Sequence, residues 1–250
     1  MPIYVNNVAM TEPGNAPYVP NLLKNLFLNF NAAIDAPGDG ERVVSVVMRG
    51  NAPPADRTFS LVRGTGTTKP VSVGGADPYL DFDGNSALAN ANASAGMTLV
   101  SGPFTAAFYL SIGDWSKADA NIGFLRGVFS RTAAIRPGGA EGIIEVAGGT
   151  SSPSWTPVTT DIKTDEKAVL IVVWDDTNGD KILAGNGGVQ NIGIASGASM
   201  QGVGFGRNAE ATTGAAVFKD RCFAVWDRAL SNDELLMVRE IWLSGEDIQS

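Results

Sequence analysis

Residues 168–174 are seven apolar residues in succession, Ala-Val-Leu-Ile-Val-Val-Trp. A membrane-spanning helix needs about 20 apolar residues, whereas a short run rich in β-branched residues is typical of a central strand buried on both faces. The turn pair Asn178-Gly179 follows, and a second apolar segment, residues 181–183, comes after it. Asn-Gly between two such segments is the strongest short-range signal for a β-hairpin. The chain is therefore expected to build its core from antiparallel β-sheets.

Other short segments also predict strands, because β-branched and aromatic residues are bounded there by turn residues. In residues 104–112 apolar side chains recur at every second position, so one face of that strand is predicted to be buried. A single true helix is expected after Ser231, where Glu234 completes a capping box and Gly245 provides a stop. The remaining predicted strands are residues 43–48, 79–84, 123–129, 142–146, 203–206 and 216–226.

The first 40 residues differ from the rest of the chain. Prolines punctuate an extended segment, and apolar residues at helical spacing then predict a short amphipathic helix. We expect residues 1–40 to form an N-terminal arm that ends in a hinge at residues 36–40, and residues 41–250 to form the sandwich. The helix could pack on its own sandwich or dock on a neighbouring subunit. The residues concerned are Pro2, Pro13, Pro17, Pro20, Leu22, Leu23, Leu26, Phe27 and Phe30.

Composition excludes several classes of function. The 250 residues contain no histidine and one cysteine, so histidine-dependent triads, histidine zinc sites and an intrachain disulfide are impossible. A net charge of -8 repels phosphate backbones, which argues against a nucleic-acid partner. Neither a signal peptide nor a membrane segment is apparent, and we expect no cofactor, no metal and a soluble product made in a cytoplasm.

Four segments carry a resemblance to a known family. Residues 79–84 read Tyr-Leu-Asp-Phe-Asp-Gly, and residues 104–109 read Phe-Thr-Ala-Ala-Phe-Tyr. Residues 172–185 give an apolar strand, a Trp-Asp turn and a strand that returns to a glycine. Residues 220–234 read Asp-Arg-Cys-Phe-Ala-Val-Trp-Asp-Arg-Ala-Leu-Ser-Asn-Asp-Glu, the most specific of the four. Together they resemble concanavalin A-like lectin/glucanase domains, in particular the laminin-G-like group, over about residues 76–245.

The resemblance implies an all-β fold, an antiparallel two-sheet jelly-roll sandwich, to which an extended or short-helical N-terminal arm and one C-terminal helix are added. Residues 1–75 have no counterpart in it. The family includes sugar binders, glucanases, adhesion modules and structural modules of virus particles, so the fold alone does not decide the function.

Two groups of acidic residues were weighed as sites. Glucanases of this family place catalytic glutamates on one strand, and Glu141 and Glu145 have the spacing to share one strand face, but the aspartate expected between them is absent. Asp176, Asn178 and Asp180 alternate as calcium ligands do, but Lys181 follows where an EF-hand loop has glycine. The alternative is an ordinary polar hairpin, and we predict neither catalytic nor metal-binding residues.

Aromatic side chains are the remaining candidates. Trp115 and Trp155 are expected in loops as possible sugar-stacking contacts, whereas Trp174 is expected in the core. Cys222 is expected to be a buried thiol. Packing between the last strand and the last helix is predicted for Trp226 and Trp242, and a structural ion pair for Asp227 with Arg228.

These observations favour a non-catalytic structural or attachment protein. We predict a component of a virus (phage) particle, such as a head decoration or tail-associated protein, located in the virion. Its expected partners are further copies of the chain, or capsid or tail proteins, contacted through residues 1–40. A carbohydrate-binding lectin-like module is the alternative, with a glycan as ligand. A glycoside hydrolase with a degenerate motif at Glu141 and Glu145 is the third hypothesis.

Overall fold

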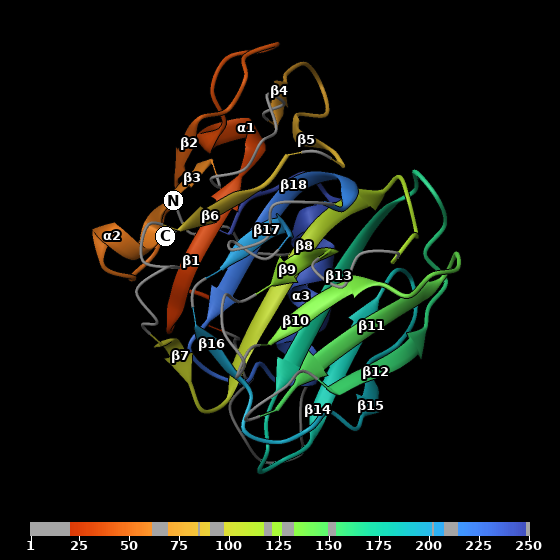
Figure 1. The fold of residues 1–250 in the computed structure, drawn as a ribbon. Helices are drawn as coiled ribbons and strands as arrows, with labels where there is room; N and C mark the ends of the chain where they lie inside the picture. The colour runs from red at the N-terminus through yellow and green to blue at the C-terminus, as the bar shows by residue number, and fades with distance from the viewer. Residues whose placement is uncertain are drawn as a thin grey trace.

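The computed structural model describes residues 21–61, 70–84, 86–90, 98–117, 122–126, 133–149, 154–201, 203–207 and 215–248. Two antiparallel sheets face each other and enclose one large apolar core, as the sequence predicts (Figure 1). The predicted arm falls partly outside this description, because residues 1–20 are not among the described ones. The division of the chain at residue 40 therefore stays a prediction.

The back sheet has eight strands in the order β15-β14-β13-β8-β18-β5-β4, and β1 also pairs with β18. Its strands are β1 (Leu26–Asn31), β4 (Val71–Val73), β5 (Tyr79–Asp83), β8 (Phe104–Ile112), β13 (Lys167–Trp174), β14 (Asp180–Ala184), β15 (Gln190–Ile192) and β18 (Val217–Trp226).

The front sheet has eight strands in the order β12-β11-β10-β9-β17-β6-β3-β2. They are β2 (Ser45–Val47), β3 (Thr58–Leu61), β6 (Leu88–Asn90), β9 (Ile122–Arg126), β10 (Ala134–Pro137), β11 (Ile143–Gly148), β12 (Ser154–Thr159) and β17 (Gly204–Arg207). The other elements are a two-stranded ribbon of β7 (Thr98–Ser101) and β16 (Ser199–Gln201), and the helices α1 (Ala32–Asp35), α2 (Pro54–Arg57) and α3 (Asn232–Leu243).

Strands β8 and β13 confirm the two patterns on which the sequence prediction rests. The five apolar side chains at alternate positions of β8 all enter the core between the sheets. Strand β13 is buried on both faces, since Leu170 and Val172 enter that core while Val169 and Ile171 enter a second apolar cluster behind the sheet. The hairpin from β13 to β14 forms as predicted, with Val173 paired to Lys181. The strand predicted at residues 123–129 is β9, and residues 127–129 lie outside the described part.

Strand β18 is the longest in the sandwich and joins three neighbours. One edge pairs with β8, while the other edge pairs with β5 at Val217 to Asp220 and with β1 at Cys222 to Trp226. A β-bulge separates these two halves at Arg221. A bulge leaves one extra residue in the strand and re-aims its side chain. Here Arg221 and Cys222 both point to the outer face of the back sheet.

The helix predicted from Leu22 to Phe30 does not form, and most of this segment is β1 instead. From Leu26 to Asn31 the free edge of β18 supplies backbone hydrogen-bond partners, and that tertiary pairing overrides the helical pattern. An irregularity in the pairing after Leu26 turns Leu28 and Phe30 into the core. Of the two alternatives weighed for the arm, the described part, residues 21–40, packs on its own sandwich.

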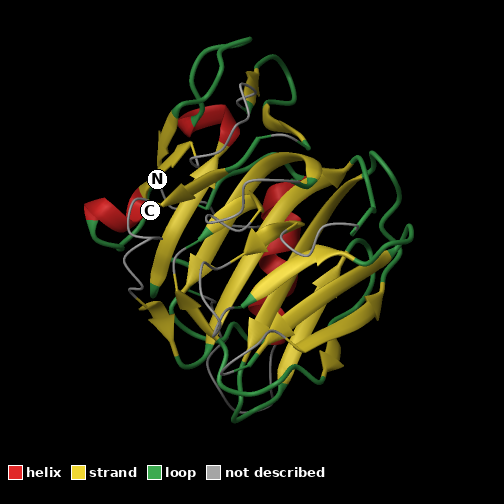
Figure 2. Cartoon of the chain, viewed as in Figure 1, coloured by secondary structure: helices red, strands yellow, loops and turns green. Residues whose placement is uncertain are grey.

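Helix α3 is the predicted C-terminal helix, with the predicted capping box. It covers the outer face of the back sheet (Figure 2), where Trp226 and Trp242 pack in the second cluster as expected. The ion pair predicted between Asp227 and Arg228 is wrong. Arg228 instead makes a bidentate pair with Glu234, at 2.8 Å for each contact, because the capping box fixes that carboxylate beside the strand–helix corner.

No helix in the described ranges is both long and apolar enough to cross a membrane.

A truncation in β1 tests whether the first described strand is part of the fold. The Leu28 side chain is fully buried in the core, whereas Leu23 is 47% exposed. Leu28→Ala is expected to lower the free energy of unfolding by about 2–5 kcal/mol. The matched control Leu23→Ala is expected to change it by less than about 0.5 kcal/mol. Urea unfolding followed by tryptophan fluorescence measures both, and equal effects would contradict the placement of β1.

Asp220 offers a test by pH. Its side chain lies on the core face of β18, opposite Leu110 and Leu80. The carboxyl oxygen Oδ1 has no hydrogen-bond partner among the described residues. Burial raises the pKa of this carboxyl well above its ordinary value. Above about pH 4 the unfolded chain releases this proton while the folded chain keeps it, so stability falls as pH rises. Asp220→Asn lacks this term. The free energy of unfolding of the variant minus that of the parent is expected to increase from pH 4 to pH 8, and a pH-independent difference would disprove a neutral buried carboxyl.

Candidate functional site

Part of the front sheet carries charged and aromatic side chains on its outer face. The register pairs Arg136 of β10 with Glu145 of β11, and Ala147 of β11 with Trp155 of β12. Residues that alternate with these, such as Ile135 and Val146, enter the core. Because strand side chains alternate between faces, the charged residues and the tryptophan share the outer face.

Three of these side chains and a lysine form one network, here called the front-face cluster: Lys117, Arg136, Glu145 and Trp155. Nε and Nη2 of Arg136 both reach Oε2 of Glu145 at 2.7 Å, and Lys117 Nζ donates to Oε1. The Arg136 guanidinium carbon lies 3.8 Å from the centroid of the Trp155 ring. A guanidinium over an indole face is attracted by the ring electrons, so the cation fixes the orientation of the tryptophan.

The electrostatics hold Glu145 in its charged form. Burial of this side chain, which is 9% exposed, opposes ionisation. Hydrogen bonds and charges from Lys117 and Arg136 together outweigh burial, and the pKa of the Glu145 carboxyl is lowered. Both carboxylate oxygens are therefore committed to cations at neutral pH.

An open depression of about 670 Å³ adjoins the cluster at one end of the sandwich. It is lined by residues 113–117, 139–141 and Thr164, so Lys117 belongs to both. Beneath it Trp115 Nε1 donates to Thr164 Oγ1 at 3.1 Å, and that hydroxyl donates to Glu141 Oε2 at 2.6 Å. The depression is thus lined by two carboxylates, Asp114 and Glu141, and by the ammonium group of Lys117.

The three tryptophans considered as sugar contacts differ in how exposed they are. Trp155 is partly exposed, but it lies in strand β12 rather than in a loop. Trp115 is 7% exposed and packs against the core, so its assignment as a surface contact is wrong. The reason is its large apolar ring, which joins the core between the sheets while its indole N–H still donates to the exposed Thr164 hydroxyl. Trp174 is core, as predicted, and stacks on Phe104.

Glu141 and Glu145 do not share a strand face, contrary to the expectation from their spacing. Gly142 has a φ of +79°, and it ends a turn before β11 begins at Ile143. Glu141 lies in that turn and is exposed. Hydrogen bonds from the hydroxyl and backbone of Thr164 lower the pKa of its carboxyl.

The carboxylates of the Asp176–Asp180 loop accept hydrogen bonds from the protein itself. Asp180 accepts from the backbone N–H groups of Asp175 and Ile194, and Asp176 accepts from that of Gly197. Within the described ranges no group of three or more acidic or sulfur-bearing side chains is arranged to hold a metal ion. These hydrogen bonds are typical of an ordinary polar hairpin, and the absence of a metal site in this loop stays a prediction. Cys222 is a buried thiol whose pKa is raised by burial, in line with its predicted packing role.

Sequence reasoning missed Arg136 and Lys117 as site residues. No local signal gives the partner of Arg136, because a two-residue turn at Gly138-Gly139 would place it opposite Glu141, whereas the observed register with its longer loop places it opposite Glu145. No local signal marks Lys117, because a loop after β8 brings it to β11.

The sequence matches no protein-family model and no curated protein. Among solved structures the fold is similar to the receptor binding domain of botulinum neurotoxin type G, with a TM-score of 0.57 and 10% identity over 88% of this chain. It is also similar to a botulinum neurotoxin serotype D ligand binding domain in complex with N-acetylneuraminic acid, with a TM-score of 0.54 and 11% identity over 87% of this chain. The chain spans about half of the length of these proteins, 52% and 51%. At such low sequence identity, the structural similarity establishes the β-sandwich fold and nothing further. The assignment to the concanavalin A-like family stays a prediction.

Replacing Glu145 tests the ion network. The pKa of its carboxyl is lowered in the fold, so its contribution to stability is present above the ordinary pKa near 4.5 and is lost as pH falls through the folded value. Glu145→Gln is expected to lower the free energy of unfolding at pH 7 by about 1–3 kcal/mol. The difference from the parent should shrink below pH 4.5. Glu141→Gln, at the exposed turn, is the control and should cost less; chemical unfolding across pH 3–8 measures both.

Proposed function

We propose that this chain is a non-catalytic carbohydrate-recognition module and that the front-face cluster contacts the glycan. The observation that carries the proposal is the position of Trp155, a partly exposed indole on the outer face of β12, oriented by Arg136. A sugar ring presents C–H groups on its faces and hydroxyl groups at its edge. An indole with charged hydrogen-bonding side chains beside it matches both features.

The rigidity of the front-face cluster supports the same proposal. Arg136 and Glu145 are held by each other and by Lys117, so a ligand does not have to order them. Binding affinity rises when side chains need no further immobilisation. Lys117, 40% exposed, and Glu141, in the open depression, extend the polar surface beyond the first sugar ring.

The similar solved structures are consistent with a binding module. One is named a receptor binding domain, and another is a ligand binding domain in complex with N-acetylneuraminic acid. Because the shared property is the fold, the glycan and the residues that contact it have to come from this chain.

Glycoside hydrolysis is disfavoured by the state of the carboxylates. A general acid needs a raised pKa, whereas the pKa of Glu145 is lowered by two cations. Glu141 lies in a turn and its pKa is lowered as well, so these two residues do not supply an acid and a nucleophile on one strand. A role in a virus particle stays a prediction, and glycan attachment is compatible with it wherever the protein is displayed.

Glycan binding by the full chain tests the proposal. We expect an immobilised glycan panel to reveal ligands with weak affinity, and Trp155→Ala to reduce binding by about five- to thirtyfold, because a buried aromatic contact contributes about 1–2 kcal/mol. Trp155→Phe should retain part of the binding. Val47→Ala, at an exposed site on β2 in the same sheet, is the matched control and should bind like the parent. Binding that is unchanged in folded Trp155→Ala would exclude the front-face cluster.

A further inference from the structure

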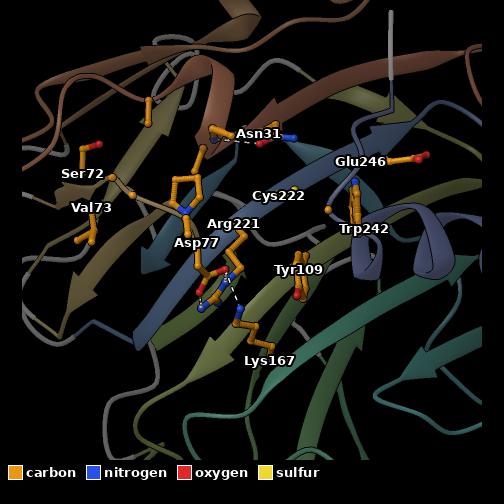
Figure 3. Close-up of a pocket in the computed structure, with 18 of the residues that line it drawn as sticks. Asn31, Ser72, Val73, Asp77, Tyr109, Lys167, Arg221, Cys222, Trp242 and Glu246 are labelled. Atoms are coloured by element: carbon orange, nitrogen blue, oxygen red, sulfur yellow. Dashed lines mark hydrogen bonds and ion pairs between the residues drawn. The ribbon is translucent and has the colours of Figure 1, made fainter.

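A second pocket, of about 560 Å³, opens on the other side of the molecule. It lies on the outer face of the back sheet, between α1, the loop from β4 to β5, the bulge of β18 and the end of α3 (Figure 3). Its size is in the range of small-molecule sites. Nothing in the front-face cluster contributes to it, because none of the cluster residues lines this pocket.

The bulge in β18 places the key arginine of this pocket. Arg221 Nε and Nη2 each reach one oxygen of Asp77 at 2.9 Å, and Nη1 donates to Ser111 Oγ at 3.0 Å. The Arg221 side chain is 7% exposed, and each of its three nitrogens donates one hydrogen bond to Asp77 or Ser111. It therefore acts as a fixed positive charge in the floor, not as a free ligand contact.

Asp77 is held at the tip of the loop between β4 and β5. Asp39 accepts from the backbone N–H of Gly74, and Ser72 donates its hydroxyl to the Pro37 carbonyl at 2.7 Å, which ties the loop to the segment after α1. Hydrogen bonds from Arg221, opposed by burial and aided by Lys167, lower the pKa of Asp77 to about 2. The carboxylate is ionised at every physiological pH.

Lys167 and Tyr109 are two groups beside the Asp77–Arg221 pair that have hydrogen-bonding capacity left for a ligand. Lys167 Nζ lies 2.9 Å from Asp77 Oδ1, and its side chain is 47% exposed. An ammonium group has three N–H donors, so two remain after the bond to Asp77. The Tyr109 hydroxyl makes no hydrogen bond to a described residue, and burial raises its pKa, so it keeps its proton. Figure 3 shows both groups beside the Asp77–Arg221 pair.

The balance of charge selects the ligand. Two cations and one carboxylate leave a net positive charge at this end of the pocket, and the remaining donors outnumber the acceptors. A single carboxylate on the ligand matches that charge. The exposed carboxylate of Glu246 at the opposite rim can accept hydrogen bonds from ligand hydroxyl groups, and it repels a second negative charge on the ligand.

The walls suit a compact ring. Trp242 is buried against the pocket, and its Nε1 has no hydrogen-bond partner among described residues. The other wall is apolar, made by small side chains. They are Ala32, Ala33, Ala36, Pro37 and Pro78.

We propose that this back-sheet pocket binds a monocarboxylate on a polyhydroxylated ring, the chemistry of a uronic acid, with the carboxylate on Lys167 and Tyr109. The site is separate from the front-face cluster and does not depend on glycan binding there. The protein thus has two ligand surfaces, one on each sheet.

Titration calorimetry and amide NMR of the full chain with sodium glucuronate test the proposal, with glucose and inorganic phosphate as the comparison ligands. Glucuronate is expected to bind at least about tenfold more tightly than either, because it alone combines a single carboxylate for Lys167 with the hydroxyl groups of a ring. Amide shifts should cluster at Tyr109, Ser111 and Arg221. Tighter binding of phosphate, or shifts confined to other regions, would overturn it.

Substitutions separate this site from the first. Lys167→Met keeps the aliphatic stem and should weaken glucuronate binding by at least about tenfold, and Tyr109→Phe should weaken it several-fold. Lys219→Met, on β18 but outside the pocket, is the matched control and should bind like the parent. Unchanged affinity in folded Lys167→Met and Tyr109→Phe overturns the assignment. Trp155→Ala should leave glucuronate affinity unaltered, so failure of one proposal leaves the other standing.

Discussion

The antiparallel pairing of β18 with β8 is the interaction on which the rest of the fold depends. It extends from Phe218 opposite Ile112 to Trp226 opposite Thr105, through the middle of the back sheet. The other edge of β18 pairs with β5 before the bulge at Arg221 and with β1 after it. Because of the bulge, Arg221 and Cys222 both lie on the outer face, while Phe218 before it and Phe223 after it both enter the core.

Burial of the back sheet on both faces explains why a chain of short strands needs α3. The outer side chains of β13 and β18 are apolar where the helix covers them, and Leu235, Val238 and Trp242 complete that cluster. Beyond the end of the helix the same face becomes polar at Tyr109, Lys167 and Arg221. The back-sheet pocket begins where the helical cover ends.

The two candidate ligand surfaces differ in how their charges are used. In the front-face cluster both oxygens of Glu145 are occupied by cations, which orients Trp155 through Arg136 and leaves the carboxylate unsuited to proton transfer. In the back-sheet pocket Arg221 is held by Asp77 and Ser111, while Lys167 and Tyr109 retain donors for a ligand. The first arrangement presents a rigid surface, and the second can pair with an anionic group on a ligand.

The sequence by itself determined the strands β8 and β13, the Asn-Gly hairpin and the capped C-terminal helix, because periodicity, turn chemistry and capping are local properties of neighbouring residues. The two-sheet arrangement was implied by the resemblance of four segments to a known family. Only the tertiary structure decided that Leu26–Asn31 is a strand, that Trp115 turns inward, and that Arg228 pairs with Glu234. It alone brings Asp77, Lys167 and Arg221 together. These outcomes depend on partners far along the chain, such as the free edge of β18. A local sequence pattern does not indicate which distant strand edge or side chain a segment will contact.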